Sequence, residues 1–401
     1  MSQLIDVTAA QEKIVAHAKA TTTTEKIALI NACNRVLAED VRSTMNVPPF
    51  HNSAMDGYAF RFCDLDKTAD STTLPVSQYL AAGVVPTELA AGTAARIFTG
   101  GVVPSNADTV VMQENCEASD DQVTIKQHPS EYANVRKAGE DIQQGEIIAT
   151  QGTSLTAAQL GLLASVGTSD VLVFKPLRIG LLSTGNEVIQ PGDTLTPGKI
   201  YNSNHYFLTG LLQQLHCEII DSGNVSDEPD QLRKTLLKLA ETTDIIISTG
   251  GVSVGDKDYV KNLMEDMGRL ELWRVNLKPG KPIAFGYIQD TPIFGLPGNP
   301  VSAYVTFLLF TRRFILATQG CSAIEIPTFQ VRANFDWPKP CKREEYLRAR
   351  YHADGTATLY PKQGSGVLSS AAWANGLIKV PPQQTIAKGD SVTFIPSPAF
   401  Y

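Results

Sequence analysis

The chain has 401 residues, of which 43% are hydrophobic and 19% are charged. A chain of this length exceeds one compact core, so we expect two to four domains. The composition is that of a soluble globular protein, which excludes disordered, collagen-like and coiled-coil classes. The net charge of -7 argues against a broad nucleic-acid-binding surface, since such a surface is basic. A small anionic ligand held by a local basic cluster remains compatible with this charge.

The N-terminus mixes acidic and basic residues where a signal peptide would have an apolar segment. The most apolar late stretch, 304–319, is interrupted by Arg312 and Arg313 and is too short on either side to span a bilayer. The six cysteines are widely spaced, without a CxxC motif or closely paired histidines, at positions 33, 63, 116, 217, 321 and 341. This spacing favours reduced thiols in the core over disulfides or a zinc site. We expect a cytoplasmic protein that neither crosses a membrane nor binds nucleic acid.

The first part of the chain carries a helix signal followed by β signals. Thr22 and Glu25 have capping-box spacing ahead of apolar residues that recur at helical intervals, which predicts a helix there. Pro48 and Pro49 break this pattern. Short β-rich runs then alternate with Gly, Pro and Asn turns up to about residue 140, which predicts a small β domain. A short helix over 156–167 and a strand over 171–175 are expected next.

From about residue 176, apolar strands alternate with amphipathic helices, which is typical of a parallel sheet covered on both faces. Strands are expected at 178–185, 217–223, 244–251, 283–287 and 291–298, and helices at 203–215, 229–241 and 299–319. After residue 326 the helical pattern stops. A terminal β domain is expected, with strands at 331–337, 345–352, 357–362 and 390–396.

Three glycine-rich loops are expected at the carboxyl edge of the parallel sheet, where ligands of such sheets bind. Glycines allow backbone N–H groups to approach a phosphate closely. The alternative is that these loops are tight turns and helix caps, and Asn299-Pro300 by itself fits an N-cap followed by Pro at the first helical position. The loop residues are Ser183, Thr184, Gly185, Gly250, Gly251, Ser253, Gly255, Pro297, Gly298, Asn299 and Pro300.

Acidic and basic residues accompany these loops. Glu187, Asp227, Asp256 and Asp258 are carboxylates that together suit magnesium, although Asp227 and Asp256 could instead cap the helices that follow them. In the run 273–282, Lys278 and Lys281 flank a Pro-Gly turn beside Arg274, and such charges suit a phosphate or another oxyanion. Solvated surface lysines are the alternative.

The chain contains seven blocks that resemble the signature of the molybdopterin molybdenumtransferases, the MoeA and gephyrin E-domain family. They lie in order across nearly the whole chain: PPFHNSAMDGYA (48–59), RIFTGGVVP (96–104), GEDI (139–142), LLSTGNE (181–187), STGGVSVGDKDY (248–259), LKPGKP (277–282) and GLPGNPVS (295–302). Two positions depart from the family pattern. His51 stands where Asp is often found, and Arg274 stands where Lys is frequent.

The resemblance implies a multidomain α/β plus β fold in an elongated homodimer. Its parts are a discontinuous N-terminal domain (1–45 and 140–175), an inserted β domain (46–139), a doubly wound parallel-sheet molybdopterin-binding domain (176–326) and a C-terminal β-barrel-like domain (327–401). It also implies a site between subunits, with Asp56 and Thr99 acting across the interface.

The resemblance also implies roles for individual residues. Glu187, Asp227 and Asp258 are expected to hold metal, and the anion-binding lysines are Lys278 and Lys281. Ser370 is expected to reach the ligand from the terminal domain, together with the loop residues above and Arg274. The residues expected to act in catalysis are Asp56, Thr99, Asp141, Glu187, Asp227, Asp258, Lys278 and Lys281.

The activity that the resemblance implies is the magnesium-dependent insertion of molybdate into adenylylated molybdopterin, with release of AMP. Expected partners are a molybdopterin adenylyltransferase and the molybdoenzymes or cofactor carriers that receive the product. Two alternatives remain open at this point. One is the adenylyltransferase itself, which would consume ATP, and the other is a scaffold that binds molybdopterin without turnover.

Overall fold

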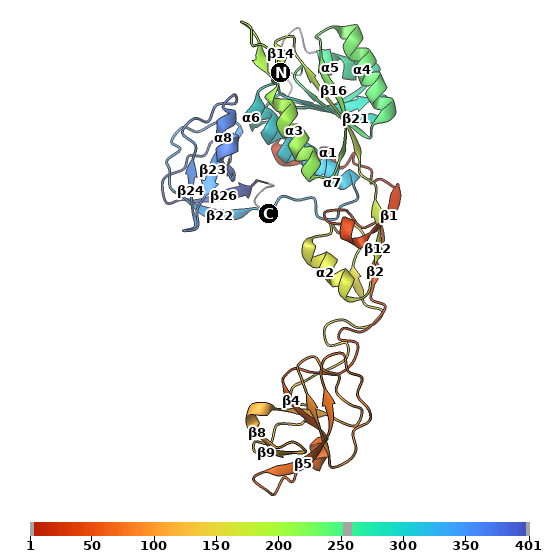
Figure 1. Cartoon of the computed structure of the whole chain (residues 1–401). Helices are drawn as coiled ribbons and strands as arrows, with labels where there is room; N and C mark the ends of the chain where they lie inside the picture. The colour runs from red at the N-terminus through yellow and green to blue at the C-terminus, as the bar shows by residue number, and fades with distance from the viewer. Residues whose placement is uncertain (1–3, 252–258, 398–401) are drawn as a thin grey trace.

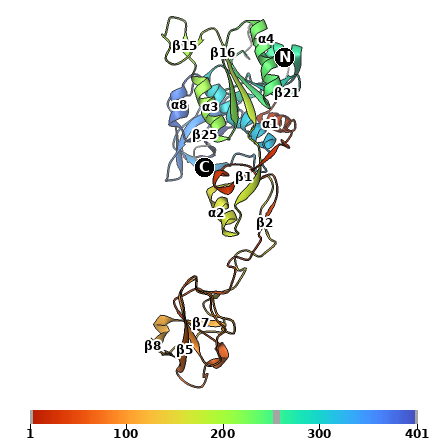
Figure 2. The ribbon, with the colours of Figure 1, turned by 45° about the vertical axis from the view of Figure 1, so that its right-hand side comes forward.

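The computed structural model of the chain describes residues 4–251 and 259–397. The molecule is elongated, with the inserted β domain at one end and the α/β domain at the other (Figure 1). The C-terminal β domain lies beside the α/β domain, and a second view shows the same arrangement (Figure 2). The predicted multidomain α/β plus β class is confirmed.

The first helix, α1 (Val7–Val15), starts at Asp6, whose carboxylate accepts a hydrogen bond of 2.8 Å from Thr8 N. Its buried face consists of Val7, Ala10 and Ile14, which share one hydrophobic core with the α/β domain. Helix α1 therefore packs with the α/β domain, although the sequence groups it with the N-terminal domain.

The helix predicted after Thr22 is wrong. This segment forms strand β1 (Thr24–Ala28) and a single turn of 3-10 helix, η1 (Leu29–Asn31). Strand β1 pairs antiparallel with β12 (Asp170–Phe174), about 145 residues away, in a register that joins Thr24 to Phe174. The local periodicity is overridden because this long-range pairing satisfies the backbone while Leu29 is buried.

The predicted helix and strand before residue 176 are confirmed as α2 (Ala157–Ser165) and β12. Thr156 and Gln159 form a capping box at the start of α2. Strand β2 (Val41–Arg42) pairs with β11 (Ile147–Ala149). The segments before and after the inserted domain therefore form one structural unit.

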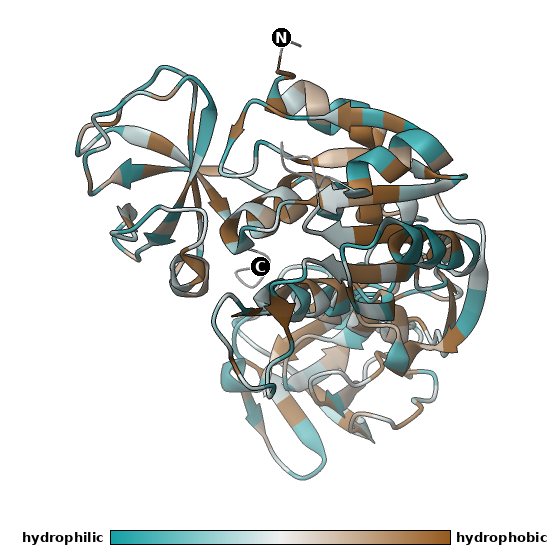
Figure 3. Ribbon diagram, turned by 90° about the horizontal axis from the view of Figure 1, so that it is seen from above, coloured by the Kyte–Doolittle hydropathy of each residue, from teal (hydrophilic) through white to brown (hydrophobic). Residues whose placement is uncertain are grey.

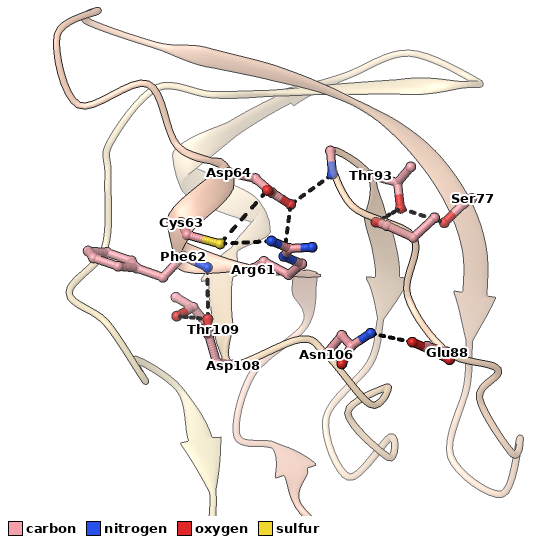
Figure 4. A network of polar contacts seen from close by, with 12 residues as sticks. Arg61, Phe62, Cys63, Asp64, Ser77, Glu88, Thr93, Asn106, Asp108 and Thr109 are labelled. Carbon is pink, nitrogen blue, oxygen red and sulfur yellow. Dashed lines mark hydrogen bonds and ion pairs between the residues drawn. The ribbon is translucent and has the colours of Figure 1, made fainter.

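The inserted domain is a β structure, as predicted. Its six-stranded sheet has the order β7-β4-β6-β5-β9-β8. Polar contacts tie its loops together: Asp108 accepts hydrogen bonds from Phe62 N and Thr109 Oγ1, and Asp64 accepts one from Gly92 N (Figure 4). The strands are β4 (Gly57–Phe60), β5 (Thr72–Leu80), β6 (Ala94–Ile97), β7 (Thr109–Met112), β8 (Cys116–Ala118) and β9 (Gln122–Ile125), with the short pair β3 (Asn52–Ser53) and β10 (Val135–Arg136) at the domain entrance and the turns η2 (Phe62–Asp64) and η3 (Gln113–Asn115).

The α/β domain contains a six-stranded sheet of order β16-β13-β17-β21-β20-β18. The first four strands are parallel, as predicted, whereas β20 pairs antiparallel with both β21 and the edge strand β18. The strand predicted at 283–287 is thus joined to β21 by a tight turn and needs no crossover helix. The strands are β13 (Arg178–Thr184), β16 (Glu218–Val225), β17 (Ile245–Thr249), β18 (Gly268–Trp273), β20 (Ala284–Ile288) and β21 (Thr291–Leu296).

Helices cover both faces of this sheet. Helix α3 (Ser203–Gln214) shares one core with Ile245 and Ile247, while α4 (Pro229–Thr242) and α5 (Tyr259–Met267) share a second core with Ile246. Neighbouring strand residues thus face opposite helix layers, which explains why the consecutive residues Ile245, Ile246 and Ile247 are all apolar and buried. Figure 3 shows this concentration of hydrophobic residues in the interior strands.

The closing helix predicted at 299–319 runs as α6 (Pro300–Thr306), a π-helical stretch η4 (Phe307–Thr311) and α7 (Arg312–Thr318). In the described part of the chain, this helix alone is long and apolar enough to cross a membrane. However, 78% of its most apolar window is buried inside the protein, where it packs in the same core as α1 and α3. Its hydrophobicity is therefore explained by its position in the core.

The C-terminal domain is a closed five-stranded barrel, because β23 pairs with both β24 and β25 while β22 and β26 complete the ring. The sequence did not predict β25 or helix α8 (Leu368–Trp373). Strand β19 (Leu277–Lys278) of the preceding domain adds to the barrel at β23. The barrel strands are β22 (Phe329–Ala333), β23 (Glu344–Tyr351), β24 (Thr356–Leu359), β25 (Gly376–Val380) and β26 (Ser391–Pro396).

All six cysteines are free, which confirms the prediction against disulfides. Their predicted core location is wrong for Cys33 and Cys63, whose residues are exposed. Cys321 is buried, and the remaining three are partly buried.

Candidate functional site

A cavity of about 520 Å³ opens at the carboxyl ends of β13, β17 and β21. The three glycine loops converge there, as predicted. A second cavity, of about 470 Å³, lies between Asn34, Val36 and the ends of α3 and α7, but its described walls contain neither glycine nor carboxylate. The first cavity is therefore the candidate site. Its walls are Ser183, Thr184, Gly185, Glu187, Val188, Ile200, Asn202, Asn204, Asp227, Thr249, Gly250, Gly251, Pro282, Pro297, Gly298, Asn299 and Ser302.

The short strands β14 (Val188–Ile189) and β15 (Ile200–Tyr201) pair in parallel beside this cavity. Val188 and Ile200 contribute apolar side chains to the wall of a cavity that is otherwise mainly polar and glycine-rich. Ile200 is 58% exposed, so this wall forms part of the rim.

The loops approach one another so closely that glycine is required. Gly250 has φ +94°, and a Cβ atom there would lie 2.6 Å from the carbonyl oxygen of Thr184. Gly298 lies against Gly250 on the other side, since its own Cβ would be 3.8 Å from Gly250 Cα. The absence of side chains lets the backbones of the three loops approach one another and line the cavity.

Two asparagines at the start of α3 hold these loops together, and sequence reasoning missed both. The side-chain amide of Asn204 donates to Thr249 Oγ1 at 2.7 Å and to Gly298 O at 2.8 Å. Asn202 caps α3 by accepting a bond from His205 N, and its amide donates to Ser183 Oγ at 3.0 Å. The signal that could have found them is the pair of asparagines directly before a helix and after a strand.

The Thr184 hydroxyl is a further polar group of the cavity. The residue is only 5% exposed, and its Oγ1 atom has no hydrogen-bond partner among the described residues. A buried hydroxyl without a partner is costly unless a ligand or water satisfies it. This hydroxyl is therefore available to a bound molecule.

Two of the predicted metal-binding carboxylates, Glu187 and Asp227, line the cavity. Asp227 exchanges hydrogen bonds with Asn186: Asn186 N donates to Asp227 Oδ2, and Asp227 N donates to Asn186 Oδ1, both at 3.2 Å. Helix α4 instead has Glu228 at its N-cap, without a side-chain capping bond. The alternative in which Asp227 serves only as a helix cap is thus not supported.

No cluster of three or more His, Cys, Asp or Glu residues suited to a metal is present within 4–251 and 259–397. The third predicted metal residue, Asp258, lies outside the described residues, as do Asp256 and the predicted loop residues Ser253 and Gly255.

The predicted basic residues do not line the cavity. Pro282, at the end of their loop, is a wall residue. Lys278 Nζ forms an ion pair of 2.6 Å with Glu345 of the barrel, so Lys278 is not simply a solvated surface lysine. Arg274 has φ +69°, and its guanidinium lies 3.6 Å from the ring centroid of Trp273. Their ligand roles stay predictions.

Ser370, which was expected to reach the ligand, is fully buried in the barrel. Its Oγ accepts a hydrogen bond of 3.1 Å from Arg348 Nε and donates one of 2.6 Å to Val367 O. Ser370 is not among the cavity's wall residues, and its hydroxyl is engaged by Arg348 and Val367 instead. The buried Arg348 was not identified from the sequence.

Asn299 and Pro300 occupy the N-cap and first position of α6, as their sequence indicates. The Asn299 side chain makes no capping hydrogen bond, and the residue lines the cavity together with Pro297. A capping role alone does not account for Asn299.

The predicted residues of the inserted domain form a separate group. Asp56 Oδ1 accepts hydrogen bonds from Thr99 N and Thr99 Oγ1, both at 2.8 Å, and these bonds hold the pKa of Asp56 below its ordinary value. Asp141 is exposed near the domain entrance, and His51 Nδ1 accepts a bond from Ala138 N at 3.0 Å. Within one chain, the inserted domain lies at the end opposite the cavity (Figures 1 and 2).

Comparison with known families agrees with this domain order. Residues 5–167 match the MoeA N-terminal region (domain I and II), residues 180–317 match the probable molybdopterin binding domain, and residues 330–397 match the MoeA C-terminal region (domain IV).

Relatives and solved structures cover nearly the whole chain. A molybdopterin molybdenumtransferase of Haemophilus influenzae is 36% identical over 395 residues, covering 96% of this chain and 97% of the relative. One of Bacillus subtilis is 33% identical, covering 89% and 86%. The crystal structure of a molybdopterin biosynthesis MoeA protein from Pyrococcus horikoshii OT3 has a TM-score of 0.87 at 27% identity and covers 98% of this chain and 100% of its own. The chain therefore belongs to the molybdopterin molybdenumtransferases, a transferase family of molybdenum cofactor biosynthesis.

Proposed function

We propose that this protein inserts molybdate into adenylylated molybdopterin with release of AMP, in a magnesium-dependent reaction. The observation that supports this most directly is the cavity, in which three glycine loops and two carboxylates meet at one sheet edge. Such an edge suits a phosphorylated ligand. The similarity of the whole chain to molybdopterin molybdenumtransferases supports the same substrate class.

The loops would bind the pyrophosphate that joins molybdopterin to AMP. Gly251 and Gly298 would offer their backbone N–H groups at the cavity wall, and the Thr184 hydroxyl has no competing partner within the described residues. The Gly250 N–H already donates to Leu296 O at 3.1 Å, so Gly250 contributes the close approach of the loops instead. Asn204 keeps two of these loops in register. Because the donors are already positioned, little reorganisation is needed when charge develops on the phosphate oxygens.

The donor set fits magnesium. Glu187 and Asp227 supply carboxylate oxygens, and magnesium in proteins is commonly held by one or two carboxylates together with substrate phosphates and water. When bound, the ion would neutralise charge on the phosphoanhydride. We retain Asp258 as a proposed third metal residue, and Ser253 and Gly255 as proposed ligand-loop residues.

Lys278 and Lys281 would attract molybdate to the mouth of the cavity beside Pro282. Their compact charges suit an oxyanion, and Arg274 would add a further positive charge. Ser370 would act through Arg348, since its hydroxyl accepts from that guanidinium.

We further propose a homodimer in which Asp56, Thr99 and Asp141 of one chain act at the cavity of the other. The separation of the inserted domain from its own chain's cavity supports this arrangement (Figure 1). The protein would work in the cytoplasm, between a molybdopterin adenylyltransferase and the molybdoenzymes or carriers that receive the cofactor.

The test is AMP release from adenylylated molybdopterin by the purified protein with magnesium, with and without molybdate. Molybdate-dependent AMP release that accompanies metal insertion is expected. Binding of the substrate without cleavage in either condition would contradict the proposed activity and favour a scaffold, whereas ATP consumption with metal-free molybdopterin would favour an adenylyltransferase.

A further inference from the structure

Glu345 is a buried carboxylate that contacts the lysine loop, residues 277–282. It is 2% exposed and lies on strand β23 of the barrel. Its Oε1 pairs with Lys278 Nζ at 2.6 Å, and its Oε2 accepts a hydrogen bond of 3.2 Å from the indole Nε1 of Trp337. Both carboxylate oxygens therefore have a partner, and neither moves freely.

The backbone of the lysine loop is anchored independently of this ion pair. Strand β19 pairs in parallel with β23, in a register that sets Lys278 opposite Glu345. Arg343 Nη1 donates to Leu277 O at 3.1 Å. On the other side, Gly280 has φ +111° and lies close to α6, since a Cβ there would be 2.6 Å from Thr306 Cγ2. These contacts fix the backbone of Lys278 but do not restrain its long side chain.

The two members of the pair differ in exposure. The Lys278 side chain is 46% exposed, while that of Glu345 is 3% exposed. The carboxylate thus lies on the protein side of the ammonium group. An ammonium group has three N–H donors. One points to Glu345, so the others remain for an anion approaching from solvent, and that anion need not displace the carboxylate.

Glu345 also influences a second cation. Burial lowers the pKa of Arg348 to about 10, and the negative charge of Glu345 opposes this shift. Arg348 in turn holds Ser370. One carboxylate therefore connects the lysine loop of the α/β domain to the buried arginine of the barrel.

We infer that Glu345 is a positioning residue that fixes the Lys278 ammonium for an oxyanion substrate. This inference rests on the proposed function, in which Lys278 attracts molybdate. Without the carboxylate, the Lys278 side chain would sample many rotamers, and ordering it would oppose binding. The alternative is that the pair only fastens the barrel to the α/β domain.

A double-mutant cycle on the full chain separates these two roles. Molybdate affinity is measured by calorimetry for the wild type, Lys278→Ala, Glu345→Gln and the double variant. We expect each single change to weaken molybdate binding roughly tenfold, as for the loss of a charge-assisted contact. We expect the double variant to bind as weakly as Lys278→Ala, because Glu345 acts through Lys278.

Glu344→Gln is the matched control. Glu344 is the neighbouring buried carboxylate on β23, but it accepts a hydrogen bond from Tyr346 and pairs with Lys379 instead. Its variant should retain wild-type molybdate affinity. If Glu345→Gln does not fold, Glu345→Asp keeps the charge and withdraws it by one methylene, and a several-fold loss of affinity is expected.

Two results would overturn the inference. Losses that add in the double variant would show that Glu345 acts independently of Lys278, and wild-type affinity in Glu345→Gln or, where that variant does not fold, in Glu345→Asp would show no role in anion binding. A wild-type protein that does not bind molybdate would instead contradict the proposed function and, with it, the premise of this inference.

Discussion

The side-chain amide of Asn204 donates a hydrogen bond of 2.8 Å to the carbonyl of Gly298, 94 residues further along the chain. The same amide donates to Thr249. The start of helix α3 thus holds the loops that follow β17 and β21. The shape of the cavity therefore depends on a residue that the glycine motifs do not include.

Replacing Asn204 by Ala should loosen both loops. The buried acceptor Thr249 Oγ1 and the partly buried acceptor Gly298 O would lose their donor, at a cost of about 1–3 kcal/mol in the free energy of unfolding. The affinity for AMP should fall as well. Urea denaturation and AMP titration measure the two effects. Gln213→Ala, at an exposed position on the same helix, is the control, and an Asn204→Ala variant as stable as this control would contradict the proposed contact.

Gly250→Ala should distort the site more than substitutions that leave the loop backbone in its native conformation. The new methyl group would lie 2.6 Å from Thr184 O in a left-handed conformation, so the two loops must separate. Such strain costs about 1–3 kcal/mol. Thermal unfolding should show a lower midpoint. Gly161→Ala, in helix α2 with open space around it, should instead stabilise the protein by about 0.4–1 kcal/mol. Equal effects of the two substitutions would rule out the close approach.

Glu187→Gln should raise the magnesium concentration needed for half-maximal AMP release roughly tenfold, since the neutral amide is a weaker ligand for a hard cation. Magnesium removal with a chelator should abolish the release in the wild type. Glu241→Gln, on the exposed end of α4, is the control for loss of one negative charge. An unchanged magnesium requirement in Glu187→Gln would argue against metal binding by this carboxylate.

The pKa of Asp56 should rise toward its ordinary value in Thr99→Val, because the substitution removes one of the two hydrogen bonds from Thr99. The folded-state pKa is depressed. This contact therefore contributes stability above the unfolded-state pKa, and the contribution is lost as the pH falls through the folded-state value. Carboxyl NMR titration of both proteins measures the shift. Identical titration curves would show that the Thr99 hydroxyl does not act on Asp56.

Alkylation should distinguish the cysteines by exposure and pKa. Burial raises the pKa of Cys217 to about 12 and that of Cys116 to about 11, which keeps both as unreactive thiols at pH 8. The exposed Cys33 and Cys63 should react at least about tenfold faster than Cys217. Peptide mass spectrometry after brief iodoacetamide treatment reads each site, and unfolding in urea should remove the difference. Early labelling of Cys217 in the native protein would be inconsistent with its burial.

Sequence patterns predicted the α/β domain best. Runs such as 178–184 and 245–249 contain consecutive apolar residues, which is typical of strands covered on both faces, and glycines follow in the loops after them. The convergence of these loops followed from topology, because parallel strands end at the same edge.

Contacts between distant segments were less predictable. The stretch 27–41 has helical periodicity, yet strand β1 at its start pairs with a strand about 145 residues away, since tertiary pairing outweighs a weak local preference. The barrel's β25 and α8 were missed because short elements carry little periodic signal.

By itself, then, the sequence determined the domain order, the two-sided apolar strands and the glycine loops, because these depend on local spacing and residue type. Only the tertiary structure decided that Asn204 donates a hydrogen bond to the loop after β21, that Ser370 accepts one from Arg348, and that Glu345 forms an ion pair with Lys278. Each of these depends on side chains from different domains or elements meeting in a register that no local pattern encodes.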